Sequence, residues 1–166
     1  MYFVVKKIYR MKTCFINSPL GITKIVGDEN GIAEIAILSE GNLSKTIPLE
    51  LQEAAAQLSN YFDGKRKHFN FKLNPKGTDF QQKVWQELLN IPFGKTLSYL
   101  ELSKKLGDVK AIRAVASANG KNPLWIVVPC HRVIGTDGSL TGYAGGLWRK
   151  KWLLEHEKPS IQQSLF

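Results

Sequence analysis

Apolar β-branched residues occur in short runs in the first part of the chain. In "FINSPLGITKIVGDENGIAEIAIL", residues 15–38, these runs lie on both sides of "GDENG". Asn and Gly are the residue types that most readily adopt the positive φ values of a tight turn. We therefore predict strands in this segment, with a hairpin turn at Asn30-Gly31.

The next two segments differ in their period. "PLELQEAAAQLSNYFDG" is predicted to form a helix that ends at Gly64, with one apolar face made by Leu51, Ala55, Leu58 and Phe62. "HFNFKLN", residues 68–74, alternates apolar and polar positions and predicts a half-buried strand. Together these elements predict a small α/β domain over residues 1–75, of which residues 1–10 would be an extension if translation starts at Met11.

From residue 76 onward the pattern is helical. "TDFQQKVWQELLNI" begins with a capping box, Thr78 with Gln81, and places Phe80, Val84 and Leu88 on one stripe. We predict a mainly helical domain over residues 76–166 that ends in a flexible tail.

Two short helices are predicted next. "SYLELSKKLG" opens with a second capping box, Ser98 with Glu101, and closes at Gly107. "DVKAIRAVASANG" then begins at an Asp cap and ends at Asn119-Gly120. Two short helices joined at a glycine are typical of a helix-turn-helix, although an ordinary helical hairpin has the same pattern.

The second of these helices is thin and positively charged. Most of its side chains are small, and its charged residues with the adjoining turn are Lys110, Arg113 and Lys121. This combination suits a DNA groove, where contacts to phosphates supply most of the non-specific affinity. It suits close packing between helices equally well.

Composition narrows the possible partners and cofactors. The formal net charge is +9, which makes an anionic partner plausible without identifying one. The two cysteines, Cys14 and Cys130, lack the spacing of a disulfide scaffold or a zinc site, so we expect no metal and no cofactor. No apolar run is long enough for a membrane span or a secretory signal, and we expect a cytoplasmic protein.

One stretch carries the residue types of nucleophilic chemistry. In "IVVPCHRVIG", residues 126–135, Pro129 is expected to end a buried strand and to place Cys130 at the following turn. His131 and Arg132 favour the reactive thiolate if they lie close to the sulfur, whereas a buried cysteine with a purely structural role is the alternative. Glu155 and Glu157 are the candidate carboxylates to orient the histidine. The glycine-rich "GTDGSLTGYAGG" between them has no phosphate-binding pattern.

At these residues the sequence resembles the O6-alkylguanine-DNA alkyltransferases, also called methylated-DNA–protein-cysteine methyltransferases. The resemblance is carried by "PCHRVIG" within "NPLWIVVPCHRV", and by "TGYAGGLWRKKWLLEHE", "AIRAVASANG" and "TDFQQKVWQELLNIPFGKTLSY". It implies a ribonuclease-H-like α/β domain followed by a winged helix-turn-helix-like domain. It also implies a DNA repair protein that moves the alkyl group from O6-alkylguanine in double-stranded DNA to its own cysteine, once per molecule. We further expect activity on O4-alkylthymine and a monomer.

The resemblance assigns roles to individual residues. Cys130 would be the nucleophile and final methyl acceptor, His131 the base acting through water, Glu157 the residue that orients His131, and Tyr99 the proton donor to guanine. Arg113 would fill the space that a flipped nucleotide leaves in the base stack, with the helix in the minor groove. The remaining expected DNA contacts are Lys110, Ala111, Ala114, Ser117, Lys121 and Arg132.

The remaining assignments concern the guanine pocket. Asn122 would brace the hinge before the active-site strand, and Tyr143 with Gly145 would form a wall of the pocket. Two positions depart from common relatives: Ala144 replaces a serine, and Trp125 replaces a smaller residue, which favours methyl over bulky adducts. Three other functions remain open from the residues alone: a lesion sensor without transfer, a transcription regulator, and a Cys-His hydrolase.

Overall fold

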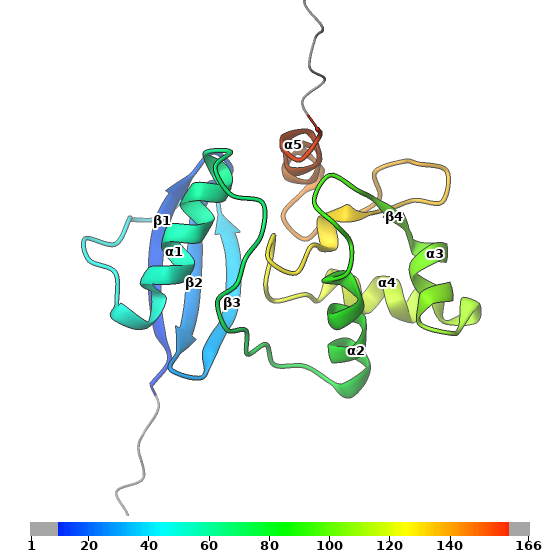
Figure 1. The fold of residues 1–166 in the computed structure, drawn as a ribbon, viewed down its shortest axis with the longest axis horizontal. Coiled ribbons are helices and arrows are strands. Elements are labelled where there is room, and N and C mark those ends of the chain that lie inside the picture. The colour runs from blue at the N-terminus through cyan, green and yellow to red at the C-terminus, as the bar shows by residue number, and fades with distance from the viewer. Residues whose placement is uncertain (1–9, 160–166) are drawn as a thin grey trace, which may run out of the picture. The chain divides into compact units, whose positions relative to one another are not determined.

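The computed structural model describes residues 10–159 and divides the chain into two compact units, residues 1–75 and 76–166 (Figure 1). The expected N-terminal extension up to residue 9 and the expected tail from residue 160 lie outside the described residues. None of the helices described between residues 10 and 159 has the length and apolar character needed to span a bilayer.

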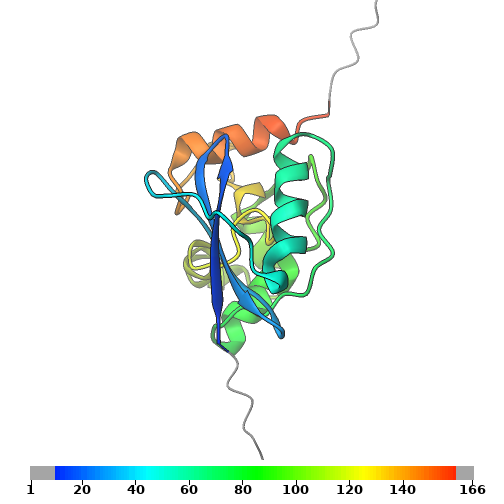
Figure 2. The same cartoon turned by 90° about the vertical axis from the view of Figure 1, so that its left-hand side faces the viewer.

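The first unit is one antiparallel sheet with one helix. Strands β1 (Lys12–Ser18), β2 (Gly21–Asp28) and β3 (Gly31–Leu38) pair in sequence order. Helix α1 (Leu49–Phe62) contacts all three strands, as Figure 2 shows. The predicted apolar face of α1 is confirmed, because all four of its residues are buried. They meet a sheet face that includes Ile25 and Ile35, which form the core of the unit.

The predicted hairpin is confirmed, but its turn differs in one detail. Asp28 pairs with Gly31, so Glu29 and Asn30 form a two-residue loop. Gly31 has a φ of 128°, whereas Asn30 does not take the positive φ we expected. Its backbone N–H instead donates to Oδ1 of Asp28 at 2.7 Å, which stabilises the turn without a left-handed asparagine.

The strand predicted for residues 68–74 does not form. The segment keeps the predicted alternation of half-buried and exposed side chains, but its only strand-like pairing in the described structure is one parallel bridge between Leu73 and Ile32. Ile32 donates to the Lys72 carbonyl at 2.9 Å, and Asn74 donates to the Ile32 carbonyl at 2.7 Å. The alternation therefore predicted the burial of the side chains correctly. It did not predict the backbone pairing, since a regular ladder requires continuous pairing with a neighbouring strand.

The second unit is mainly helical, as predicted. Its described elements in order are α2 (Asp79–Leu88), β4 (Leu97–Ser98), α3 (Tyr99–Lys105), the 3₁₀ turn η1 (Val109–Ala111), α4 (Ile112–Gly120), the 3₁₀ turn η2 (Cys130–Arg132), β5 (Val133–Ile134) and α5 (Leu147–His156). The Thr78–Gln81 capping box is present in full. At the second predicted box, Ser98 Oγ accepts from the backbone of Glu101 at 3.0 Å.

The buried face of helix α2 differs from the apolar stripe that we predicted. Val84 and Leu88 are buried, but Phe80 is 40% exposed. Trp85 is buried in its place, and its indole Nε1 donates to the carbonyl of Ala118 in α4 at 2.9 Å. The partner lies 33 residues away, so local periodicity could not reveal this contact.

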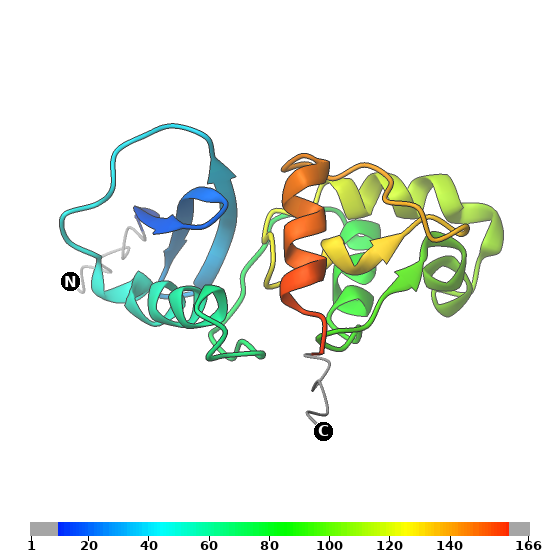
Figure 3. The ribbon, with the colours of Figure 1, turned by 90° about the horizontal axis from the view of Figure 1, so that it is seen from above.

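The strand expected at residues 126–128 is also absent. The chain instead turns there, and Ile126 is the only described non-glycine residue with positive φ, at 74°. Strand β5 follows η2 directly and pairs in parallel with β4, so that Leu97 lies opposite Val133 and Ser98 opposite Ile134. Figure 3 shows β5 beside β4 and near α5. This pairing brings the first residue of α3 close to the turn that contains Cys130.

We predict that Trp85→Phe lowers the free energy of unfolding by about 0.5–1.5 kcal/mol, because it removes the indole hydrogen bond and leaves the Ala118 carbonyl only the Lys121 backbone N–H as a donor. Urea denaturation of the full chain measures this. Phe80→Ala is the control on the exposed side of α2 and should cost clearly less. Equal losses in the two variants would contradict the assigned faces of α2.

Candidate active site

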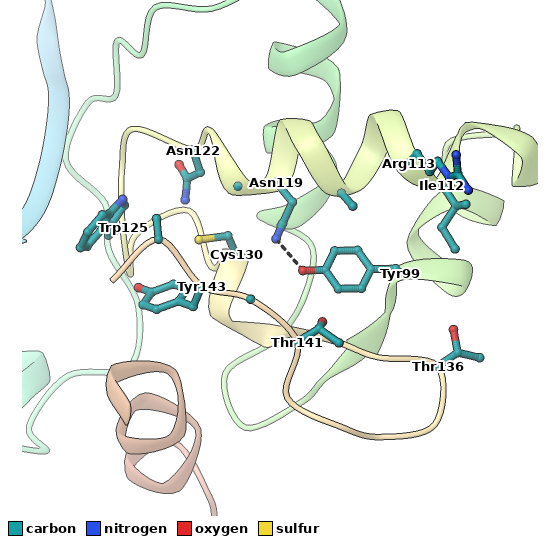
Figure 4. Close-up of a pocket in the computed structure, with 14 residues that line it drawn as sticks. Tyr99, Ile112, Arg113, Asn119, Asn122, Trp125, Cys130, Thr136, Thr141 and Tyr143 are labelled. Atoms are coloured by element: carbon teal, nitrogen blue, oxygen red, sulfur yellow. Dashed lines mark hydrogen bonds between the residues drawn. The ribbon is translucent and has the colours of Figure 1, made fainter. Parts of the chain in front are cut away.

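A cavity of about 700 Å³ in the second unit is lined by seven of the sixteen predicted site residues, including Cys130 and Tyr99. It is lined by the start of α3, by α4, by the turn before Cys130 and by the loop that follows β5. Figure 4 shows the Cys130 sulfur between Asn122 and Tyr143. Tyr99 and Arg113 also line this cavity, so groups far apart in sequence share one space.

Cys130 is the first residue of η2 and is 4% exposed. Burial raises the pKa of its thiol to about 11, although the Asn122 side chain, the Lys150 charge and two backbone groups favour the thiolate. The thiol is therefore protonated at neutral pH in the protein alone. A reaction at this sulfur requires a group that removes the proton.

His131 is suited to that task by its tautomer. Its ring is fully buried, and Nε2 lies 2.9 Å from Oε2 of Glu157. Burial lowers the pKa of His131, and the nearby Glu157 only partly opposes this, so the ring is neutral. A neutral imidazole that donates from Nε2 carries its lone pair on Nδ1. Nδ1 is buried and has no hydrogen-bond partner among the described residues, so it can accept a proton from a water molecule.

The structure corrects the expected role of Arg132. We expected a DNA contact, but the residue is only 7% exposed. Its Nε donates to Oε1 of Glu157 at 2.7 Å, its Nη2 to Oε2 at 3.0 Å, and its Nη1 to the Ile91 carbonyl at 2.6 Å. A guanidinium whose donors face inward in this way fixes other groups and does not reach DNA.

Glu157 is thus the common partner of His131 and Arg132. It follows the last residue of α5 and is 1% exposed. Burial alone would raise its pKa, but the hydrogen bonds and charges of His131 and Arg132 outweigh this and hold the pKa at about 2. The carboxylate is therefore ionised at any pH at which the protein would work.

Asn122 holds the turn that leads to the nucleophile. Its Oδ1 accepts from the backbone of Leu124 at 2.9 Å, and its Nδ2 donates to the Val128 carbonyl at 2.7 Å and to the Leu124 carbonyl at 3.3 Å. These bonds span the irregular segment that contains Ile126. Asn122 therefore lies before the active-site segment, as expected, but that segment is a turn and not a strand.

One wall of the cavity is aromatic. The rings of Trp125 and Tyr143 lie with centroids 5.8 Å apart and tilted by 49°. A Cβ on Gly145 would come within 2.9 Å of Tyr143 Cε1 and 3.0 Å of Trp125 Cζ3, so only glycine allows this packing. Ala144, next to it, also lines the cavity and has no side-chain donor.

The expected DNA-contact residues other than Arg132 follow one exposed stripe. Ala111 is half-buried, and the exposed members are Lys110, Arg113, Ala114, Ser117 and Lys121. Spacings of three and four residues place them on the same side of η1 and α4. Val115, Ala118 and Asn119 are buried on the opposite side.

Two residues of the site escaped the sequence analysis. Lys150 is fully buried, and its Nζ donates to the carbonyls of Val133 at 2.6 Å and Thr141 at 2.8 Å. Lys150 lies three residues before the core residue Leu153 and seven before Glu157, and this helical spacing could have placed it on the buried face of α5. Asn119 is the second missed residue and also lines the cavity.

Within the described part of the chain, no group of three or more His, Cys, Asp or Glu side chains is arranged to hold a metal ion.

Comparison with known proteins identifies both units. Residues 11–75 match the family model "6-O-methylguanine DNA methyltransferase, ribonuclease-like domain", and residues 79–159 match "6-O-methylguanine DNA methyltransferase, DNA binding domain". The methylated-DNA–protein-cysteine methyltransferase of Methanosarcina barkeri is 44% identical over 154 residues, which is 89% of this chain and 97% of that protein.

Solved structures agree. The O6-methylguanine methyltransferase of Mycobacterium tuberculosis is 42% identical, with a TM-score of 0.81 over 91% of this chain and 96% of its own. The structure of the Mycobacterium tuberculosis OGT in complex with DNA is 44% identical, with a TM-score of 0.79 over 87% of this chain and 92% of its own. The sequence matches, the fold and the cysteine-containing cavity together show that this chain belongs to the methylated-DNA–protein-cysteine methyltransferase family.

Proposed function

We propose that Cys130 is the residue on which this methyltransferase accepts the alkyl group of O6-alkylguanine, irreversibly and once per protein molecule. The observation that carries the proposal is the placement of Cys130 at a cavity of about 700 Å³, directly followed by a neutral histidine that a buried carboxylate orients. Attack of a thiolate on an alkyl carbon gives a stable thioether, so the proposed reaction, unlike that of a Cys-His hydrolase, ends after one turnover.

The proposed step balances without a cofactor. A water molecule carries the Cys130 proton to Nδ1 of His131, and the thiolate attacks the alkyl carbon in line with the bond to O6. The S–C bond forms while the C–O6 bond breaks, and its electron pair stays on guanine. Tyr99 donates a proton to N3 of the leaving base, which neutralises the developing charge.

Lys150 and Asn122 support this step from the side of the sulfur. Both favour the thiolate of Cys130 over the thiol, and Lys150 has no carboxylate among the partners described for it. Burial lowers the pKa of Lys150, whereas the thiolate of Cys130 raises it. A buried cation near the nucleophile therefore stabilises the reactive form most when the thiol proton has left.

The partner we propose is double-stranded DNA, bound through the exposed stripe of α4. α3 and α4 supply the helix-turn-helix, in a winged arrangement of the kind the family has. The Mycobacterium tuberculosis relative has been solved with DNA, which supports a DNA-facing surface on this fold. The target atom lies inside the base stack, so the nucleotide must be flipped into the cavity. Arg113 is exposed at the cavity and is proposed to fill the vacated space.

The cavity wall bears on the range of adducts. We propose that Trp125 restricts the room for large alkyl groups, while Ala144 offers only a backbone N–H to O6. O4-alkylthymine is proposed as a second substrate. Since one unit contains every group in the proposed step, we also propose that the protein acts as a monomer, in the cytoplasm.

Incubation of the protein with excess O6-methylguanine duplex should add one methyl group per molecule, located on Cys130 by intact-protein and peptide mass spectrometry. Cys130→Ala should bind the duplex and gain no mass. Cys14→Ala is the matched control, since Cys14 lies buried in the other unit, and it should still accept one methyl. Lesion binding without any added mass in the wild type would leave a sensor in place of a transferase.

Glu157→Gln should lower the free energy of unfolding by about 3–5 kcal/mol at neutral pH, because it leaves Arg132 buried without its charged partner. The pKa of about 2 lies below the ordinary value of about 4.3, so this stabilisation is complete above about pH 4.3 and is lost as the pH falls towards 2. Urea denaturation from pH 7 to pH 2 measures both effects.

Glu155→Gln is the control for that series, because Glu155 is exposed two residues earlier. It should leave the unfolding free energy within about 0.5 kcal/mol of the wild type. If Glu157→Gln and the wild type lose stability in parallel between pH 4.3 and pH 2, Glu157 does not carry the acid sensitivity.

Arg113→Ala should slow methyl transfer from duplex DNA at least about tenfold, since an unfilled gap in the stack makes the flipped state less stable by about 1.4 kcal/mol or more. Transfer from the free base O6-methylguanine should change less than about twofold, because no stack is involved. Arg66→Ala, an exchange of an arginine in the other unit, serves as the control. A similar loss on both substrates would show that Arg113 acts inside the cavity.

A further inference from the structure

Asn119 is a polar residue on the buried side of α4. It is 5% exposed, and the other buried residues of this helix, Val115 and Ala118, are apolar. A buried amide is costly unless it forms hydrogen bonds. Its presence on this face therefore requires an explanation beyond packing.

The amide of Asn119 is directed at the proposed proton donor. Its Nδ2 donates to the Tyr99 hydroxyl, with 3.4 Å between nitrogen and oxygen (Figure 4). Its Oδ1 is buried and has no hydrogen-bond partner within the described residues. Tyr99 is thus the side-chain partner that the structure gives to this amide.

We propose that Asn119 is a positioning residue, which holds the Tyr99 hydroxyl so that its proton points at the base in the cavity. The inference rests on the proposed function, in which Tyr99 protonates the leaving guanine. A phenol oxygen has one hydrogen and accepts hydrogen bonds through its lone pairs. When Asn119 donates to a lone pair of the Tyr99 oxygen, the hydroxyl does not donate its hydrogen to the amide. The hydrogen is then available for donation to the substrate.

Thr141 occupies the other side of the same hydroxyl. It belongs to the loop after β5 and lines the cavity, and its side chain favours the ionised form of Tyr99. Burial raises the pKa of Tyr99, whereas the side chains of Thr141 and Asn119 oppose that rise. The phenol is therefore neutral before the reaction, and both contacts become more favourable as it gives up its proton.

This arrangement also links two faces of α4. The exposed face carries the stripe proposed to contact DNA, while Asn119 on the buried face contacts the first residue of α3. A polar contact between these helices at the cavity sets the hydroxyl position relative to the DNA-facing helix. Its loss should affect the chemical step and leave DNA binding intact.

The test is a double-mutant cycle on single-turnover methyl transfer at saturating O6-methylguanine duplex. Asn119→Leu, of similar size, should slow the transfer rate constant about three- to tenfold, the worth of one hydrogen bond, with Kd for the duplex unchanged within twofold. In the Tyr99→Phe background the same substitution should change the rate less than about 1.5-fold. A merely structural role of Asn119 would not produce this dependence on the Tyr99 hydroxyl.

Asn119→Asp adds a second, independent arm. An aspartate accepts and does not donate at neutral pH, so it draws the Tyr99 proton to itself and should slow transfer at least as much as leucine. Asn90→Leu, the same exchange at an exposed position after α2, should transfer at the wild-type rate. Thermal unfolding of each variant shows whether it is folded, and Asn119→Ser replaces leucine if that variant does not fold.

The failing outcomes are distinct. Equal slowing by Asn119→Leu with and without the Tyr99 hydroxyl, a wild-type rate in Asn119→Asp, or a rise in Kd without a change in rate would each overturn the inference. Absence of transfer by the wild-type protein would overturn the proposed function itself.

Discussion

The active site depends on one buried carboxylate. Glu157 receives three hydrogen bonds from two neighbouring residues, His131 and Arg132, although it lies 26 and 25 residues after them. Burying an anion and a cation is costly, and only near-ideal geometry with additional hydrogen bonds offsets it. The bidentate contact of Arg132 and its third bond to the Ile91 carbonyl supply that geometry. The end of α5, the turn η2 and the segment after α2 are therefore fixed together, and Cys130 is the residue that begins η2.

The electrostatics around Cys130 keep its thiol protonated in the resting protein. Burial opposes both the thiolate of Cys130 and the protonated form of His131, so the resting site holds a neutral thiol beside a neutral imidazole. Transfer of the proton creates an ion pair in a buried space, with Glu157 behind the imidazolium and Lys150 near the sulfur. Such a pair is stabilised most in a low-dielectric site from which a bound base excludes water. A suicide protein benefits from this restraint, because any other alkylation of the sulfur would also be final.

Local patterns in the sequence predicted the local structure well. The caps at Thr78 and Ser98, the apolar face of α1 and the hairpin at Gly31 all depend on residues a few positions apart, and the structure confirms them. The errors concern contacts between distant segments. Arg132 looked like a DNA contact because its partners Glu157 and Ile91 lie 25 and 41 residues away. Lys150 in "WRKKW" was not singled out, and Phe80 was predicted on the apolar stripe where Trp85 is buried, for the same reason. The motif "PCHRVIG" revealed the family although the strand expected before it is a turn.

Helix α4 shows how one short element can serve recognition and chemistry together. Its outer side has small or positive side chains, which lets a backbone approach DNA closely. Its inner side would normally be wholly apolar, as Val115 and Ala118 are, and these pack toward α2 through the Trp85 bond. Asn119 breaks that rule at the point where the helix reaches the cavity. Buried polar side chains are normally hydrogen-bonded, and here the acceptor is the hydroxyl proposed to protonate guanine. The position of the proton donor is therefore set by the same helix that is proposed to hold the DNA.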